Sequence, residues 1–270
     1  MASDAHVAPP QGFADALVAG VLDDALANGA RVYGVSGLQG TGKSTLAAQL
    51  VEAAAARGLC AVALSLDDFY LDRPERRRLA RDVHPALATR GPPGTHDVAL
   101  ACATLDALRA GEPVRLPAFD KLGDRRLPTD RWREARSVEL VVFEGWCLGT
   151  PAEPAAALVE PVNALERDED ADGTWRRFCN DALARDYPAL WQRIDRLLFL
   201  QPPGFEIVPE WRWQQEQALQ ARDPSRTGMT RPQVDRFVQH YERVSRQALR
   251  TLPRIADAVV RLDAARKPIG

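Results

Sequence analysis

The pattern G-x-x-x-x-G-K-[ST] is matched at each fixed position by Gly37-Leu38-Gln39-Gly40-Thr41-Gly42-Lys43-Ser44. An apolar run, Arg31 to Ser36, precedes this stretch, and a helical pattern from Lys43 to Arg57 follows it. A strand, a glycine-rich turn and a helix in this order form a loop whose backbone N–H groups can surround phosphates. A chain of this composition shows the pattern by chance about once in a thousand cases, so we interpret it as a P-loop that binds a nucleoside triphosphate.

The residues of this loop have distinct expected roles. Lys43 is expected to reach the β- and γ-phosphates, and Ser44 is expected to ligate Mg²⁺. The helix that begins near Lys43 adds the positive end of its dipole. The expected nucleotide-binding residues are Gly37, Leu38, Gln39, Gly40, Thr41, Gly42, Lys43, Ser44 and Thr45.

Around the P-loop, short apolar runs alternate with helical patterns. The expected strands are residues 31–36, 60–66, 137–143, 196–200 and 256–262. The expected helices are residues 43–57, 96–110, 174–193, 208–222 and 232–252, preceded by a first helix that begins near Phe13 and ends before Gly29. This alternation predicts an α/β fold of the P-loop NTPase type, with a mostly parallel sheet and helices on both faces.

Two long segments interrupt the alternation, at about residues 71–95 and 150–173. Both are dense in Pro, Arg or acidic residues, and we expect functional insertions or mobile loops there. The five arginines between positions 73 and 81 are diluted by three acids, so we expect a solvated loop. No internal repeat is evident, and we expect a single domain over residues 1–270 with a helical, lid-like insertion at about 202–226.

Composition and charge exclude several classes of protein. The 270 residues carry 35 basic and 37 acidic side chains, a formal net charge of -2, so we expect neither nucleic-acid nor anionic-membrane binding. No apolar stretch of about 20 residues occurs, so no membrane span is expected. The first ten residues lack the basic start and apolar run of a secretion signal, and we therefore expect a cytoplasmic location. The oligomeric state stays open.

Three carboxylates follow apolar runs, where open α/β sheets bind ligands. Asp67 and Asp68 end the run Leu64-Ser65-Leu66 and precede Phe69-Tyr70. Such an acid can orient an attacking hydroxyl or accept its proton, although adjacent acids also cap turns. Glu144, followed by Gly145, is expected to hold the magnesium shell, with an ordinary strand-ending turn as the alternative.

Further candidates lie in two loops and one helix. In Arg90-Gly91-Pro92-Pro93-Gly94-Thr95-His96-Asp97, Asp97 can cap the following helix or contact a substrate. Lys121, one of three lysines in the chain, stands beside Asp120 and near Arg125. An anionic acceptor needs a positive anchor, which Lys121, Arg125 or Arg90 can supply, although a solvated surface turn has the same composition.

The helical pattern after Pro202-Pro203-Gly204 contains Arg212. A helix there can close over the triphosphate and carry Arg212 to the charge that develops during transfer. We expect the neighbouring Trp211 and Trp213 to be packing residues.

The chain resembles the P-loop small-molecule kinases that include uridine kinase, pantothenate kinase and phosphoribulokinase, and within them the D-glycerate 3-kinase branch. The resemblance rests, in order along the chain, on residues 37–45, 65–70, 90–97, 117–125, 143–149, 163–166 and 201–216. It implies an ATP- and Mg²⁺-dependent transfer to the 3-hydroxyl of D-glycerate, with Asp67 activating the hydroxyl and Lys43 and Arg212 offsetting charge. The residues expected to contact the acceptor are Asp68, Tyr70, Arg90, His96, Asp97, Asp120, Lys121 and Arg125. The chain departs from the family at Phe119, where a tyrosine is usual.

Two alternatives stay open. One is a kinase of the same fold that acts on uridine, pantothenate or a sugar phosphate. The other is a nucleotide-dependent switch without an acceptor. A guanine-reading N-K-x-D motif is absent, because Lys follows none of Asn28, Asn163 and Asn180.

Overall fold

A six-stranded sheet forms the centre of the structure, a computed structural model that describes residues 12–222 and 228–269. Its strand order is β10-β9-β8-β1-β7-β2, and each neighbouring pair is parallel except β10 with β9. The strands are β1 (Val32–Gly37), β2 (Ala61–Ser65), β7 (Leu140–Gly145), β8 (Arg196–Gln201), β9 (Ala258–Leu262) and β10 (Pro268–Ile269). Five of them correspond to the expected apolar runs, and the α/β fold of the P-loop type is confirmed.

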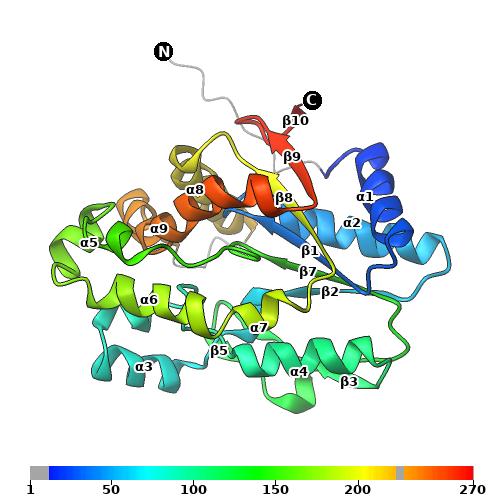
Figure 1. The fold of residues 1–270 in the computed structure, drawn as a ribbon, viewed down its shortest axis with the longest axis horizontal. Helices are drawn as coiled ribbons and strands as arrows, with labels where there is room; N and C mark the ends of the chain where they lie inside the picture. The colour runs from blue at the N-terminus through cyan, green and yellow to red at the C-terminus, as the bar shows by residue number, and fades with distance from the viewer. Residues whose placement is uncertain (1–11, 223–227, 270) are drawn as a thin grey trace.

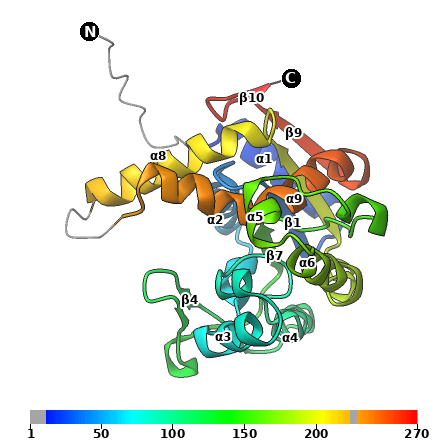
Figure 2. The ribbon, with the colours of Figure 1, turned by 90° about the vertical axis from the view of Figure 1, so that its left-hand side faces the viewer.

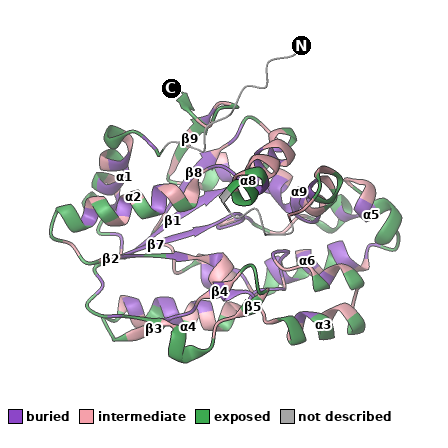
Figure 3. Cartoon of the chain, turned by 180° about the vertical axis from the view of Figure 1, so that it is seen from behind, coloured by how far each residue is buried: buried purple, intermediate pink, exposed green. Residues whose placement is uncertain are grey.

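Helices cover both faces of this sheet (Figure 1). Successive residues of the central strands point to opposite faces, so both faces carry side chains that pack against helices. On one face, Val35 and its neighbours pack with α1 (Asp15–Ala27) and α2 (Lys43–Ala56). On the other face, Val32 packs in the cluster formed with α4, α6 and α9. These helices span Val98–Arg109, Thr174–Arg185 and Arg231–Ile255. Every residue of β1 and β7 is buried, as Figure 3 shows, so the sheet is a rigid base for the loops at its edge.

The prediction of one helix over residues 174–193 is wrong. The structure has α6, which ends at Arg185, and a short α7 (Pro188–Trp191). Proline has no backbone N–H and fits the first turn of a helix, so Pro188 begins a new helix instead of continuing the old one.

The prediction of a solvated loop over the arginine run is also wrong. Residues Arg73–Asp82 form helix α3, followed by the 3-10 turn η2 (Pro85–Ala88). Asp72 and Glu75 form a capping box at its start. Arg76 is 2% exposed and donates to the carbonyl oxygens of Leu71 and Ala88. The other long segment contains η4 (Ala155–Leu158) and α5 (Ala164–Glu169).

Two small antiparallel hairpins lie between α4 and β7, where no strands were expected. One pairs β3 (Val114–Leu116) with β6 (Arg133–Ala135), and the other pairs β4 (Phe119–Asp120) with β5 (Arg125–Arg126). Short 3-10 turns complete the path at η1 (Leu66–Phe69), η3 (Thr129–Arg131) and η5 (Phe205–Ile207).

The expected lid-like segment, about 202–226, begins with η5 and continues as α8 (Val208–Arg222). Its last residues, 223–226, lie outside the described residues. Helices α8 and α9 pack together and project on one side of the sheet edge, while α3 and β4 lie on the other side (Figure 2). Among the described residues, no helix has the length and apolar character needed to cross a membrane.

Candidate active site

The P-loop runs from the end of β1 into α2 and depends on glycine at two positions. Gly40 has φ 85° and Gly42 has φ 90°, a left-handed conformation that side chains disfavour. A Cβ at Gly40 would lie 2.6 Å from Cβ of Trp211. Glycine is therefore required at position 40 both by the turn and by the close approach of α8.

A clamp that sequence reasoning missed holds the outer side of this loop. We call Trp211, Gln214 and Arg266 the P-loop clamp. Arg266 donates from Nε to the carbonyl oxygen of Gly40 at 2.7 Å and from Nη2 to Gln214 Oε1 at 2.9 Å. Its guanidinium carbon lies 4.9 Å from the ring centroid of Trp211, whose Nε1 donates to the carbonyl oxygen of Ala264. Helix α8 and the turn after β9 are thereby tied to the P-loop.

Ser44 and Glu144 meet at the carboxyl edge of the sheet. Ser44 donates from Oγ to Glu144 Oε1 at 2.8 Å. The strand register explains the meeting, since Glu144 of β7 lies between Val35 of β1 and Ser65 of β2. Glu144 is 5% exposed, so β7 places a buried carboxylate beside the Ser44 hydroxyl of the P-loop.

Asp67 lies just past the end of β2 and accepts two short hydrogen bonds. Tyr70 donates from its hydroxyl to Oδ1, and Lys121 donates from Nζ to Oδ2, both at 2.6 Å. Burial alone would raise the pKa of Asp67, but the charge and hydrogen bond of Lys121, with the Tyr70 hydroxyl and the charge of Lys43, lower it to about 2. Asp67 is therefore ionised throughout the neutral range.

Asp68 faces a different environment. Its Oδ2 accepts from the backbone N–H of Ser65 at 3.1 Å, so this side chain caps the η1 turn. Burial raises its pKa to about 6, an effect that the Ser65 hydrogen bond opposes and the charge of Asp67 reinforces. The two adjacent acids therefore have different surroundings. Asp67 is a charged group that contacts Lys121, whereas Asp68 caps a turn.

The β4–β5 hairpin brings Lys121 to Asp67 from 54 residues away in the sequence. Asp120 shapes its turn, because Oδ1 accepts from the backbone N–H groups of Leu122 and Gly123. Arg125 has a side chain that is 68% exposed and lies 3.8 Å from Asp120. Lys121 is thus the hairpin cation in contact with Asp67, whereas Arg125 is on the hairpin surface.

Three arginines converge on Asp124 at the end of this hairpin turn. Arg76 and Arg90 contact Oδ1 at 2.6 and 2.8 Å, and Arg73 lies 3.3 Å from Oδ2. Arg90 also lies over the ring of Phe119 at 5.7 Å. Because one carboxylate meets three guanidinium groups, the cluster keeps a net positive charge.

Asp97 caps α4, since its Oδ1 accepts from the backbone N–H of Leu100, and its Oδ2 lies 3.2 Å from Arg126. The capping alternative of the sequence analysis is thus confirmed for Asp97, and a substrate contact stays a prediction. His96, the preceding residue, is buried and pairs with Tyr70 as an isolated antiparallel bridge.

Arg212 lies on α8, one residue beyond the buried Trp211. Its Nη2 is 2.9 Å from Glu216 Oε2, and its guanidinium carbon is 5.7 Å from the ring centroid of Phe237 on α9. The charge of Arg212 acts on Tyr241, as do the charges of Asp67 and Arg90. Arg212 is therefore held between α8 and α9 by Glu216 and Phe237.

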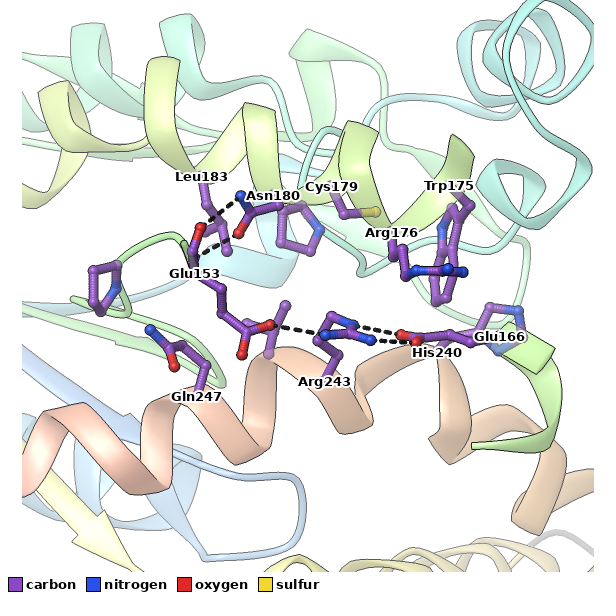
Figure 4. A pocket seen from close by; sticks show the side chains of 13 residues that line it. Glu153, Glu166, Trp175, Arg176, Cys179, Asn180, Leu183, His240, Arg243 and Gln247 are labelled. Carbon is purple, nitrogen blue, oxygen red and sulfur yellow. Dashed lines mark hydrogen bonds and ion pairs between the residues drawn. The ribbon is translucent and has the colours of Figure 1, made fainter. Parts of the chain in front are cut away.

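A separate pocket lies between α6 and α9, and its lining includes neither the P-loop nor Asp67 or Glu144 (Figure 4). Arg243 crosses it, with ion pairs to Glu166 at 2.6 Å and to Glu153 at 3.2 Å. Asn180 donates to the carbonyl oxygen of Glu153 and accepts from its backbone N–H. These paired charges hold the 150–166 segment against α9, so we interpret this pocket as structural.

No protein-family model matches the chain. Mug58, an uncharacterized kinase of Schizosaccharomyces pombe, is 37% identical over 222 residues, which are 78% of this chain and 78% of that protein. The chloroplastic D-glycerate 3-kinase of Arabidopsis thaliana is 30% identical over 223 residues, covering 78% of this chain but 46% of the plant protein. The structure of D-glycerate 3-kinase from Cryptococcus neoformans var. grubii has a TM-score of 0.80 at 26% identity, covering 94% of this chain and 97% of that one. The chain belongs to the P-loop kinase family that includes the D-glycerate 3-kinases.

The chain is accordingly a small-molecule kinase, a phosphotransferase with an alcohol group as acceptor. In this kinase the sheet edge brings together the expected P-loop residues, Glu144 and Asp67, and the β4–β5 hairpin adds Lys121. Arg90 is connected to Asp67 by two aromatic rings. It lies over Phe119, whose ring centroid is 5.2 Å from that of Tyr70. Sequence reasoning missed Asp124 and Arg266. Asp124 has φ 51°, and a short polar residue in a tight turn was the available signal.

Proposed function

We propose that this kinase transfers the γ-phosphoryl group of ATP to the 3-hydroxyl of D-glycerate, with Mg²⁺, in the cytoplasm. The observation that carries the proposal is Asp67, ionised and held between Tyr70 and Lys121 beside the P-loop. The names of the plant and fungal relatives support glycerate as the acceptor. The cations around Asp67 favour an acceptor that is a small alcohol with a negative charge.

The P-loop side of the site fits a nucleotide and its magnesium ion. Lys43 provides a point charge for the β- and γ-phosphates, and Gly40 and Gly42 allow the backbone N–H groups to turn inward. Ser44 and Glu144 are two hard oxygen donors in contact, which suits Mg²⁺, an ion that takes one or two protein ligands plus phosphate oxygens. When bound, the ion neutralises charge on the transferring phosphates.

Asp67 serves as the base in this proposal. The 3-hydroxyl attacks the γ-phosphorus, its proton passes to a carboxylate oxygen of Asp67, and the bond to the ADP oxygen breaks. A carboxylate with a low pKa is a weak base, so it accepts the proton late, as the new P–O bond acidifies the hydroxyl. Its earlier contribution is to orient the hydroxyl for in-line attack.

We assign a separate role to each charged side chain around Asp67. Arg90 anchors the carboxylate of the acceptor, because its cluster with Arg73, Arg76 and Asp124 has positive charge to spare. Lys121 keeps Asp67 ionised. Arg212 approaches from α8 to offset charge on the phosphoryl group during transfer. Asp68 and Asp120 act through the turns they hold rather than by touching the acceptor.

The test is a coupled ADP-release assay with ATP, Mg²⁺ and one alcohol at a time: D-glycerate, uridine, pantothenate or ribulose 5-phosphate. We expect D-glycerate to give the highest kcat/KM by at least about a hundredfold, because a built polar site rejects alcohols that leave its charges unpaired. Turnover of another alcohol with none of D-glycerate would overturn the assignment of the acceptor and leave the kinase activity standing.

A further inference from the structure

A chain of hydrogen bonds fixes the ring of His96. The backbone N–H of Gly94 donates to the hydroxyl oxygen of Tyr187 at 3.1 Å, and this hydroxyl lies 2.5 Å from His96 Nδ1. Burial raises the pKa of Tyr187 well above its ordinary value, so the phenol keeps its single proton. Since the oxygen already accepts from Gly94, the arrangement that satisfies every group has Tyr187 donating to Nδ1. The proton of the neutral imidazole then lies on Nε2.

The Nε2 group of His96 is a buried donor. His96 is 5% exposed, and among the described residues its Nε2 has no hydrogen-bond partner. Burial lowers the pKa of His96 to about 4, so the ring is neutral in the physiological range and the Nε2 proton stays in place. Folded proteins leave few buried donors unpaired, and those that remain commonly serve a ligand or an ordered water molecule.

Tyr70 links the ring of His96 to the candidate base. The rings of His96 and Tyr70 have centroids 4.9 Å apart, and Tyr70 donates to Asp67. Phe119 packs edge-on against Tyr70 beneath the guanidinium of Arg90. One aromatic group, made of Tyr70, His96 and Phe119, therefore connects Asp67 to Arg90, the residues to which we assign the attacking hydroxyl and the acceptor carboxylate.

We propose that Nε2–H of His96 donates a hydrogen bond to an oxygen of the acceptor other than the hydroxyl that attacks, and so selects among small alcohols. The inference rests on the proposed phosphotransfer site and narrows its substrate class to alcohols that carry a second oxygen close to the reacting one, such as hydroxy acids. A site with a buried donor disfavours an analogue that lacks the partner oxygen, because the donor is then left unpaired.

Two substitutions separate this role from a purely structural one. Asparagine in His96→Asn offers an acceptor oxygen near the position of Nδ1, so the Tyr187 contact is kept and the Nε2 donor is lost. Glutamine in His96→Gln places an amide N–H near the position of Nε2. We expect His96→Asn to raise the acceptor KM about 10- to 100-fold and His96→Gln to restore most of the difference. Both should leave the ATP KM within about twofold of wild type and remain folded by circular dichroism.

A set of analogues identifies the oxygen. Glycerol lacks the carboxylate of D-glycerate, and 3-hydroxypropionate lacks its 2-hydroxyl. His96→Asn should abolish the preference of the wild type for D-glycerate over one of these two analogues and keep the other preference. Equal losses with all three alcohols would overturn the proposal, and so would no change in any acceptor KM, which would assign Nε2 to an ordered water only.

The comparison does not depend on glycerate itself. If the wild type phosphorylates another alcohol of the panel, the assignment of glycerate fails, and the same two variants are then compared on that alcohol and on its analogues that lack one oxygen. The pH dependence gives an independent readout. A neutral donor predicts that His96→Asn raises the acceptor KM by the same factor from about pH 5.5 to 8.5. The proposal would be overturned if the acceptor KM of the wild type decreased as the pH was lowered below about 6.5 and that of His96→Asn did not. Such a result would show that the ring acts in its charged form.

Discussion

Asp67 and Asp68 are neighbours in the sequence with opposite electrostatic surroundings. Lys121 and Tyr70 hold the pKa of Asp67 at about 2, whereas burial raises the pKa of Asp68 to about 6. The position of both acids after β2 was predictable from the apolar run before them. Their separation was not, because Lys121 reaches Asp67 from a hairpin 54 residues away that no sequence pattern indicated.

Exchange of either aspartate for asparagine should separate the two roles. Asp67→Asn is expected to lower kcat about 10²- to 10⁴-fold while ATP affinity is kept, because the proton acceptor is lost and the P-loop is intact. Asp68→Asn is the matched control and should keep kcat within about tenfold, since the amide oxygen can still accept from Ser65. ADP release and equilibrium nucleotide binding measure the two quantities. A comparable loss in both variants would contradict the assignment of Asp67 as the base.

Lys121 gives a prediction on pH dependence. Its positive charge lowers the pKa of Asp67, so Lys121→Met should raise that pKa. The acidic limb that protonation of Asp67 gives the kcat/KM profile lies near pH 2 in the wild type, below the measured range, and in Lys121→Met it should move upward into that range. The profile is measured from about pH 4 to 8 beside Arg125→Met, which removes an exposed cation of the same hairpin. An unmoved acidic limb would show that Lys121 does not control Asp67.

Among the secondary-structure elements, helix α3 is one that the amino-acid composition predicted wrongly. The arginine-rich run was predicted as a solvated loop, yet Asp72 and Glu75 cap a helix and Arg76 is buried against Asp124. The capping box was readable from the sequence. The burial of one arginine among five was not, because its partners on residues 88 and 124 are supplied by the tertiary structure.

Arg76 should therefore stabilise the fold more than its neighbour Arg77. Arg76→Met removes the donor to the carbonyl oxygens of Leu71 and Ala88 and one of the three guanidinium groups on Asp124, and we expect a loss of about 1 to 3 kcal/mol in the free energy of unfolding. Arg77→Met, at an exposed position of the same helix, should change it by less than about 0.5 kcal/mol. Urea unfolding at pH 7 measures both. Equal effects would contradict the docking role of Arg76.

The contact between the P-loop and α8 makes a second prediction for an element. Gly40→Ala forces a Cβ to 2.6 Å from Trp211 at a φ of 85°. Gly58→Ala has a similar φ, 78°, but a Cβ there would meet nothing within 4 Å. We expect Gly40→Ala to weaken ATP binding more than about tenfold and Gly58→Ala to cost only backbone strain, about 1 kcal/mol of stability. Unimpaired ATP binding by Gly40→Ala would show that the P-loop clamp does not shape the nucleotide site.

At the scale of the whole molecule, the alternation of strands and helices was sufficient to predict the parallel sheet. The P-loop motif was sufficient to place phosphate binding at one edge of it. The two small hairpins escaped prediction because their strands have two or three residues, too few for a periodic pattern. They carry Lys121 and Asp124, so the acceptor side of the site was less predictable than the nucleotide side.

Two buried histidines make stability fall with acid. Burial lowers the pKa of His96 and of His240 to about 4, below the unfolded value of 6.5. Between these values the unfolded chain binds more protons, so their contribution is complete above pH 6.5 and is lost as pH falls toward 4, at most about 3 kcal/mol for each. Urea unfolding at pH 7, 5 and 4 measures the loss. This loss in the free energy of unfolding should be smaller in His240→Gln. A loss as large as that of the wild type would show that His240 does not contribute to the acid sensitivity.

Phosphoryl transfer to D-glycerate is tested most directly by ³¹P NMR of the kinase with ATP, Mg²⁺ and D-glycerate. We predict ADP and a new phosphate ester whose phosphorus couples to two protons, as expected for phosphorylation of the primary 3-hydroxyl. The ester should be missing with Asp67→Asn. Inorganic phosphate as the sole new product beside ADP, or an ester coupled to a single proton, would contradict phosphoryl transfer to the 3-hydroxyl.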